Sequence, residues 1–238
     1  MAKIEFNLLN PISHKGVKES YSPKPAKTFI PETYKNLTSY RENDLRSPTV
    51  KKCVPFLDAL TSGYIIPFFQ DYIITVDYEN EDWDITCRLE EGAGLVKEAG
   101  GHSSDQLPKG YQDGGTPIGK FPNKWFIKTP PGYSCLFVHP FNTPKTDIEL
   151  ISGVVDTDTY TNVVLFPFYF RRHAVEKKEK VQIHLKIGDP MVQIIPFKRE
   201  SWKSSVGEWQ VEKTWNHKFG GHLFDFYKKF YWHKKNYN

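Results

Sequence analysis

The chain has 238 residues, a formal net charge of +4 and a hydrophobic fraction of 39%. This composition excludes an intrinsically disordered chain and predicts a soluble globular protein that can bury a core without disulfide support. The small positive charge is compatible with a nucleotide partner but does not require one. An aromatic share of 15% favours strands and buried interfaces.

The cysteines and the apolar runs predict the compartment. Cys53, Cys87 and Cys135 lie far apart without a Cys-x-x-Cys pair, so a reducing environment without a disulfide framework is expected. No apolar run at the N-terminus resembles a signal peptide, and none elsewhere has the length of a membrane span. Secretion by a signal peptide and a membrane partner are therefore not expected.

Residues 1–50 form the first predicted unit. Ile4 and Phe6 alternate with polar residues, as in a strand. Residues 11–48 contain five prolines, which predicts an extended arm with one short helix after Pro31. Such an arm either lies over its own domain or reaches a neighbouring subunit. The assembly prediction is that it contacts another subunit or partner.

Residues 51–200 form the predicted β core. Apolar residues from Val54 to Leu60 suit a short helix or an irregular turn, and short apolar runs then predict strands. The first strands are expected at Gly63–Pro67, Tyr72–Val76 and Asp82–Arg88. Residues 90–124 are rich in glycine but match no phosphate-binding pattern, so they are a candidate lid, a partner-contacting loop or a flexible insertion.

From Trp125 to Phe197, short β-branched and aromatic runs alternate with Pro, Gly, Asn and Asp, which is typical of several short strands joined by tight turns. The fold class is therefore mainly β, with a jelly-roll-like core as one form. Residues 201–238 are predicted to be an aromatic, basic C-terminal extension that follows a polar connector. Leu223, Phe226 and Phe230 have helical spacing, so a helix is expected there.

Two carboxylates are the first candidates for chemistry. Asp156 and Asp158 lie in a turn between strand-like runs, where they could orient a water molecule or bind a hydroxyl group. The alternative is that they are ordinary turn-forming residues. His139 and His184 could join a carboxylate in a metal site of the oxygenase type, but no His-x-Asp or His-x-His pair exists. Structural histidines and no metal site are expected.

Two segments carry a resemblance to a known family. Gly153–Tyr160 (GVVDTDTY) resembles the Gly-Val-Ile-Asp-x-x-Tyr motif of the dUTPase and dCTP deaminase superfamily, and Gly188–Ile194 (GDPMVQI) resembles a later strand of that superfamily. The resemblance implies a compact β-clip fold and a homotrimer with sites between subunits. It also implies that Asp156 orients the attacking water and Tyr160 packs on the sugar.

The further substrate-binding candidates are Asp158, from the same two-carboxylate turn, and Ser134, Gln193 and Lys218. Ser134 stands near the place of the family's Arg-Ser-Ser phosphate segment, which lacks its Arg here, and Lys218 precedes a Gly-Gly pair where the family has a Gly-rich lid. The turn has one more residue before Tyr160 than the family motif. No cofactor is expected, except Mg²⁺ if the chain hydrolyses nucleotides.

Most of the chain also resembles an uncharacterised family of tailed phages and some bacteria, on TPPGYS (Thr129–Ser134), SGVVDTD (Ser152–Asp158) and PMVQIIPF (Pro190–Phe197). That resemblance implies a phage protein located in the host cytoplasm or the virion. Three hypotheses follow. The first is a non-enzymatic oligomeric virion or accessory protein that binds itself or other phage proteins. The second is a dUTPase-like enzyme acting on pyrimidine nucleotides, and the third is a metal-dependent β-barrel oxygenase.

Overall fold

The computed structural model describes residues 2–9, 21–79, 82–89, 106–108, 118–171, 180–208 and 226–238. Within them the protein is mainly β, as the sequence predicts, and its strands pair antiparallel. The strands are β1 Glu5–Leu8, β2 Lys24–Pro25, β3 Tyr40–Arg41, β4 Asp44–Pro48, β5 Tyr64–Pro67, β6 Tyr72–Glu79, β7 Asp82–Leu89, β8 Gly119–Phe121, β9 Trp125–Lys128, β10 Tyr133–Val138, β11 Ile148–Leu150, β12 Gly153–Val155, β13 Phe166–Phe170, β14 Lys180–Leu185 and β15 Pro190–Lys198.

Helical structure is short. It consists of η1 Ala26–Phe29, α2 Glu32–Lys35, η2 Val50–Lys52, α3 Val54–Thr61 and α6 Phe226–Phe230. The helix predicted after Pro31 is confirmed by α2, and the helical alternative for the Val54 segment is confirmed by α3. Among the helices in the described part of the chain, none combines the length and the hydropathy that a bilayer crossing requires.

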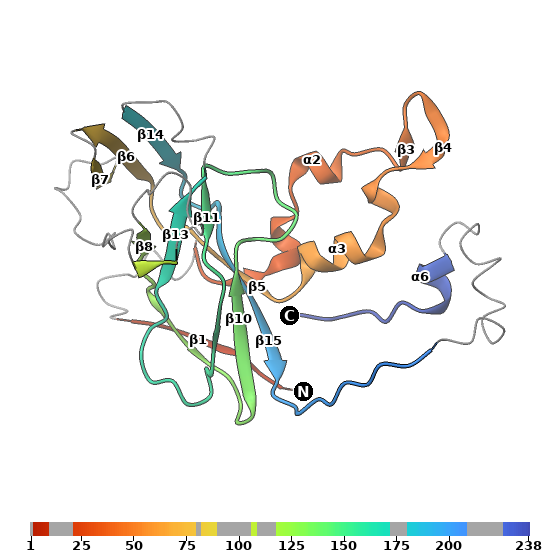
Figure 1. Ribbon diagram of the computed structural model, residues 1–238. Coiled ribbons are helices and arrows are strands. Elements are labelled where there is room, and N and C mark those ends of the chain that lie inside the picture. Colours follow the sequence, from red (N-terminus) through yellow and green to blue (C-terminus); the bar gives the residue numbers. More distant parts are fainter. Residues whose placement is uncertain are drawn as a thin grey trace.

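The largest sheet has the strand order β12-β10-β15-β5-β2. Smaller sheets have the orders β14-β6-β7, β11-β13-β8, β1-β9 and β3-β4. Figure 1 shows β6, β7 and β14 on one side of the large sheet, and α2, α3 and the β3–β4 hairpin on the other. The predicted strands β5 and β6 are both present, but they belong to two different sheets.

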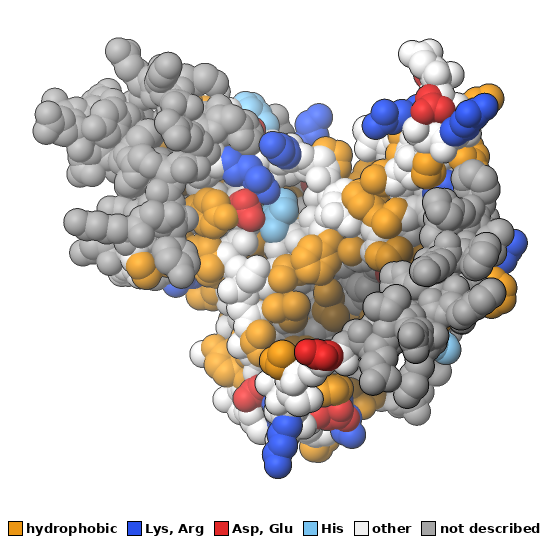
Figure 2. Space-filling model, turned by 45° about the vertical axis from the view of Figure 1, so that its right-hand side comes forward, with side chains coloured by type: hydrophobic (Ala, Val, Ile, Leu, Met, Phe, Trp, Pro, Cys, Tyr) orange, Lys and Arg blue, Asp and Glu red, His pale blue; other side chains and the backbone are white. Residues whose placement is uncertain are grey.

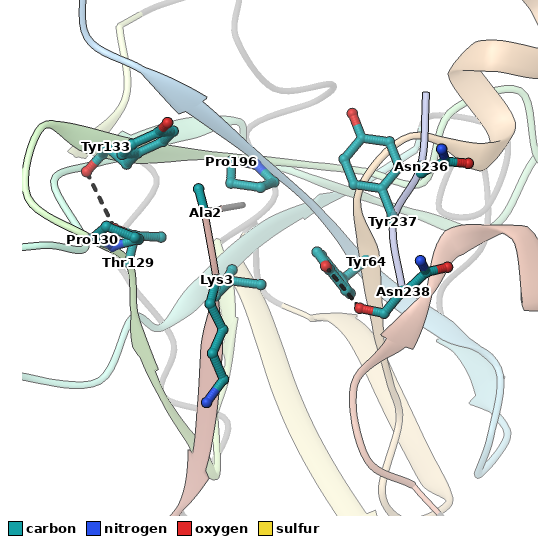
Figure 3. A pocket seen from close by; sticks show the side chains of 11 residues that line it. Ala2, Lys3, Tyr64, Thr129, Pro130, Tyr133, Pro196, Asn236, Tyr237 and Asn238 are labelled. Carbon is teal, nitrogen blue, oxygen red and sulfur yellow. Dashed lines mark hydrogen bonds between the residues drawn. The ribbon is translucent and has the colours of Figure 1, made fainter. Parts of the chain in front are cut away.

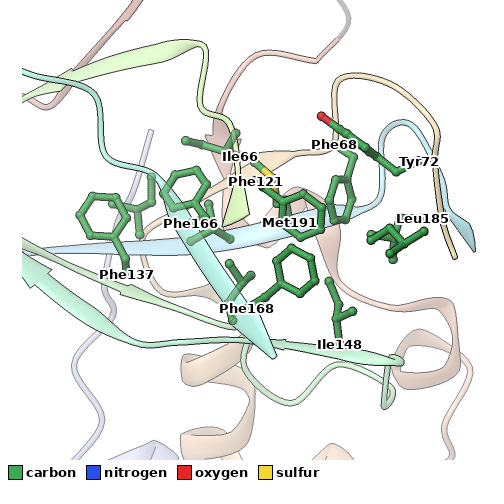
Figure 4. Packing of buried hydrophobic residues seen from close by; sticks show 14 of the residues in the cluster. Ile66, Phe68, Tyr72, Phe121, Phe137, Ile148, Phe166, Phe168, Leu185 and Met191 are labelled. Carbon is green, nitrogen blue, oxygen red and sulfur yellow. The ribbon is translucent and has the colours of Figure 1, made fainter. Parts of the chain in front are cut away.

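One aromatic core joins these sheets (Figure 4). β13 follows a strict alternation, with Phe166, Phe168 and Phe170 buried and the residues between them half-buried. Phe168 stacks on Phe121 of β8 with 4.1 Å between ring centroids, and Phe121 meets Phe68 edge-on at 5.1 Å. Aromatic pairs of this geometry stabilise the fold beyond the contribution of the apolar area that they bury.

A glycine is required where α3 turns into β5. Gly63 has a φ of +69°, and a Cβ at this position would lie 1.9 Å from the carbonyl oxygen of Ile194 in β15. The absence of a side chain therefore allows β5 to lie directly beside β15.

The N-terminal arm lies at least in part on its own domain. In its described part, β2 pairs with β5, and Tyr34 of α2 stacks on Phe56 of α3 with 5.6 Å between ring centroids. Lys51 donates hydrogen bonds to the carbonyl oxygens of Tyr34 and Lys35, at 2.9 and 2.8 Å. Contact of this arm with another subunit stays a prediction.

The predicted C-terminal helix and the Gly-rich loop are described only in part. The C-terminal extension is helical only at Phe226–Phe230 in the described residues, while residues 201–208 and 232–238 form neither helix nor strand. Most of the Gly-rich loop at 90–124 lies outside the described residues.

Truncation of the central ring tests the core. Phe168 is 1% exposed, so Phe168→Ala removes a fully buried ring and leaves a cavity. We expect a loss of about 3–5 kcal/mol in the free energy of unfolding, measured by urea denaturation. Leu45→Ala is the control, since Leu45 is 76% exposed and should change stability by less than about 0.5 kcal/mol. Equal losses in the two variants would contradict the packing.

Candidate functional site

The candidate site is a turn that follows β12. The amides of Thr159 and Tyr160 both donate to the carbonyl oxygen of Asp156, at 3.0 and 2.8 Å. Asp and Thr suit such a turn because their side chains hydrogen-bond nearby backbone. The turn brings Asp156 and Asp158 to the same end of the large sheet as the loop that precedes β10.

That loop is itself a tight turn. Pro131 and Gly132 occupy its centre, the amide of Tyr133 donates to the carbonyl oxygen of Pro130 at 3.2 Å, and Gly132 has a φ of +84°. A glycine is favoured there because its positive φ strains other residues. The turn directs the amide of Gly132 toward Asp158.

Asp158 is the most tightly held carboxylate in the site. Its side chain is only 4% exposed, and its Oδ2 accepts a hydrogen bond from the amide of Gly132 at 2.8 Å. The guanidinium of Arg199 donates to both carboxylate oxygens, Nη1 to Oδ1 at 2.8 Å and Nη2 to Oδ2 at 2.5 Å. This fork-to-fork geometry is the strongest form of Arg–carboxylate pairing.

Asp156 joins the same network at its surface. Its Oδ1 accepts a hydrogen bond from the buried Ser134 hydroxyl at 2.6 Å and lies 3.2 Å from Nη1 of Arg199. Arg199 also donates to the Ser134 hydroxyl oxygen at 3.0 Å. The Asp156 side chain is 59% exposed, so it is the carboxylate of the pair that solvent can reach.

Arg199 completes the site, although no sequence motif indicates it. It follows β15 directly, and its amide donates to the carbonyl oxygen of Gly132 at 2.8 Å, which continues the pairing between β10 and β15. The register of these two strands could have indicated Arg199. It pairs Ser134 with Phe197, so Arg199, two residues further along the chain, comes to lie beside Gly132.

The electrostatics of the site follow from these contacts. Hydrogen bonds from Arg199 and from the Gly132 amide hold the pKa of Asp158 well below its usual range. The same partnership with Asp158, together with the nearby Asp156, raises the pKa of Arg199. Lys128 brings a second cation, because its Nζ donates to the carbonyl oxygen of Asp158 at 2.5 Å. Two carboxylates and two cations therefore leave the cluster close to neutral.

Below the turn lies a buried layer. The hydroxyls of Thr129 and Thr157 are 2.7 Å apart, and the Thr157 hydroxyl also donates to Sγ of Cys135 at 3.3 Å. Cys135 is fully buried, and burial raises the pKa of its thiol to about 11. A thiol in this state is a poor nucleophile.

The other predicted site residues are placed differently. Tyr160 ends the turn and is 42% exposed. Gln193 is buried and lies at the other end of the β10–β15 pair, where it donates to the carbonyl oxygens of Ala59 and Ser62 and accepts from the amide of Phe141. The structure therefore brings Ser134, Asp156 and Asp158 together but not Gln193. Lys218 lies outside the described residues.

A pocket of about 410 Å³ is lined in part by Thr129, Pro130 and Tyr133, from the turn that precedes β10 (Figure 3). Its other walls come from residues 2–4, Tyr64 and Pro196, and from the C-terminal residues 236–238. Its size is within the range of small-molecule sites. The three tyrosine rings and two prolines make its walls largely aromatic and apolar.

The histidines do not form a metal site in the described part of the chain, where no three His, Cys, Asp or Glu side chains gather in a suitable arrangement. His184 lies in β14. His139 comes just after the end of β10, and β10 and β14 belong to different sheets. Burial, and to a smaller extent Arg171, lower the pKa of His139. A lowered pKa favours the neutral ring of an ordinary structural histidine.

Comparison of the chain with protein-family models, with curated proteins and with solved structures found no match. The candidate site is therefore interpreted from its own geometry.

The Asp158–Arg199 pair predicts a specific pH dependence of stability. Because the pKa of Asp158 is lowered in the folded state, its charge stabilises the fold above the usual pKa of about 3.9, and this contribution disappears as the pH falls further. We expect Asp158→Asn to be less stable than the wild type at pH 7, with the difference shrinking toward about pH 3. Urea midpoints at both pH values measure it.

Glu200→Gln is the matched control, because Glu200 pairs with Lys198 at the surface and both side chains are about half exposed or more. Such exposed pairs contribute little, so this variant should follow the wild type at both pH values. A stability difference for Asp158→Asn that stays constant with pH would contradict the proposed charge effect.

Proposed function

We propose that the chain is a non-enzymatic structural or binding protein that assembles with copies of itself. One observation carries this proposal. Residues 199–208, here named the connector, leave the end of β15 without joining a helix or strand (Figure 1). In the connector, Trp202 is 85% exposed and Val206 is 104% exposed. Two large apolar side chains this exposed, four residues apart in one segment, support a surface that a partner covers.

The spacing within the connector supports the same proposal. Residues that are an even number of positions apart lie on one face of an extended chain, so Trp202 and Val206 can face one partner together. Lys203, at an odd position between them, would face the opposite way in such an extended chain. Residues 201–208 belong to no helix or strand.

Further apolar side chains are exposed at the C-terminal end. Tyr227 is 45% exposed and Phe230 is 66% exposed, both on α6. Figure 2 shows hydrophobic side chains gathered at a hollow in the middle of one face of the molecule. Trp, Tyr and Phe are the residues that protein interfaces prefer, so the C-terminal region is a suitable assembly surface.

The state of Asp158, a predicted substrate-binding residue next to the catalytic candidate Asp156, supports a structural role. Both of its carboxylate oxygens accept hydrogen bonds from Arg199, and Oδ2 also accepts one from the amide of Gly132, so little of the carboxylate is left to bind a substrate. These contacts support a structural role, in which the ion pair ties the β12 turn to the start of the connector.

The finer assignments belong to the same proposal. A β-clip or jelly-roll arrangement of the large sheet, a homo-oligomer such as a trimer, and a phage origin with a place in the virion or host cytoplasm rest on the sequence resemblances. The mainly β fold is compatible with each of them. An antiparallel sheet with an exposed apolar connector also suits binding to other virion proteins.

A dUTPase-like enzyme acting on pyrimidine nucleotides is the second candidate. The convergence of Ser134, Asp156 and Arg199 favours it, because a hydroxyl, a solvent-exposed carboxylate and a guanidinium meet at one point. Arg199 could supply the cation that the missing Arg-Ser-Ser segment would carry. Its charge is already balanced by two carboxylates, however, so it attracts phosphate weakly.

Variants of the connector test the assembly proposal. We expect Trp202→Ser with Val206→Ser to weaken self-association about 10–30-fold, since truncation of a central aromatic contact costs on the order of 2 kcal/mol. Light scattering after size exclusion, over a range of concentrations, measures this effect. Lys203→Ser, on the opposite face, is the control and should leave the mass unchanged. A wild type that stays monomeric at all concentrations would refute the proposal.

A nucleotide panel tests the second candidate. A nucleotide that binds only the folded state raises the melting temperature, and hydrolysis releases phosphate or pyrophosphate in the presence of Mg²⁺. If the chain is an enzyme, Asp156→Asn should abolish turnover while changing stability by roughly 1 kcal/mol or less, as for other exposed carboxylates. No melting shift and no product with the wild type would exclude this function and leave assembly as the remaining proposal.

A further inference from the structure

The C-terminal residues 231–238, here named the tail, lie on a surface built by α3 and β5. The first anchor is Asp58 of α3. The indole Nε1 of Trp232 donates to both of its carboxylate oxygens, at 3.1 and 3.0 Å, and Lys235 Nζ donates to Oδ2 at 2.5 Å. The Asp58 side chain is only 19% exposed, so this charged contact is partly shielded from water.

The second anchor lies at the end of the tail (Figure 3). The ring of Tyr237 meets the ring of Tyr64 edge-on, with 6.0 Å between centroids. The hydroxyl of Tyr64 donates to the carbonyl oxygen of Asn238 at 3.3 Å, and Lys27 donates to its side-chain oxygen at 3.2 Å. The groups that hold the tail are thus side chains at positions 27, 58 and 64 of the body.

This receptor surface is complete without the tail. Asp58 is positioned by α3, and Tyr64 is positioned by β5 and by an edge-on contact with Phe6 at 5.4 Å. The tail forms no strand with the body in the described residues. Because the contacts are side-chain contacts on a preformed surface, an identical tail from a second molecule can make every one of them.

The length of the chain allows this exchange. Residues 209–225 separate the connector from α6. A segment of this length can span at most roughly 55 Å when fully extended, which is more than the width of a small domain. The tail can therefore reach the receptor surface of a neighbouring subunit.

We propose that the tail is exchanged between two copies of the chain, so that the tail of each copy binds the Asp58 and Tyr64 surface of the other. This inference rests on the proposed self-assembly and names its partner surface. Exchange explains the exposed connector, because a connector that crosses to a second copy brings Trp202 and Val206 against that copy. A reciprocal arrangement forms a closed twofold dimer with two identical contacts, each strengthening the other.

A charge exchange at the first anchor tests this proposal. Two single variants are needed. Asp58→Lys reverses the charge on the receptor surface, and Lys235→Glu reverses the charge on the tail. Each variant alone places like charges together, whether its tail binds its own body or another copy of itself. In a mixture, both contacts between unlike copies join opposite charges. We expect each variant alone to be mainly monomeric and the mixture to form a 1:1 dimer with twice the monomer mass of 27.7 kDa.

The outcomes separate this inference from the proposed function. A wild-type oligomer that both variants retain unchanged would refute tail exchange and leave assembly through the connector intact. Variants that turn monomeric and stay so after mixing would also refute exchange. A monomeric wild type would refute both proposals. Lys234→Glu is the matched control, because the structure gives its side chain no contact with Asp58.

A second measurement needs no substitution. Wild-type protein labelled with ¹⁵N is mixed with unlabelled protein, the mixture is allowed to exchange, and Lys235 is joined to Asp58 by a zero-length carbodiimide cross-link. We expect cross-linked peptide pairs that contain one labelled and one unlabelled partner. Pairs of uniform labelling only would show that each tail binds its own body and would overturn the inference.

Discussion

The aromatic core that joins several small sheets is the constraint on which the rest of the structure depends. A two-stranded sheet is at best marginally stable alone, and a small sheet needs a buried apolar face; most sheets in the described residues have only two or three strands. Their apolar faces must therefore meet in one core. The stack of Phe121 on Phe168 provides the centre, and Phe68 and Tyr72 close it with edge-on contacts. The turns that carry Asp156 and Gly132 are fixed because the strands beside them end on this core.

The sequence predicted strands better than it predicted their partners. Alternation identifies β13, since Phe166, Phe168 and Phe170 lie on one face. Apolar runs likewise identify β5 and β6, but they suggest two neighbouring strands around a turn. In the structure β6 pairs with β14, which is more than a hundred residues further along the chain. Local patterns do not contain this information, because strand pairing depends on segments that are distant in sequence.

The candidate site was predictable only in part, for the same reason. A short motif indicates Asp156 and Asp158, and turn chemistry explains both. Arg199 has no motif, and its role arises from the antiparallel register that brings the end of β15 to the start of β10. Gln193 matched a motif, yet its amide is buried and uses both its donor and its acceptor to hold α3 and the loop after β10. A resemblance identifies residue types, whereas the fold decides what those residues contact.

The bonds that hold Asp158 in place also set the starting point of the connector. Arg199 is held through its amide by Gly132 and through its guanidinium by Asp158, so the chain leaves β15 from a fixed position. Three residues after Arg199, the side chain of Trp202 is 85% exposed. For the assembly proposed above, a rigid origin reduces the conformational entropy that the connector would lose on binding. The ion pair, in which the Asp158 side chain is only 4% exposed, therefore fixes the point from which the chain leaves β15.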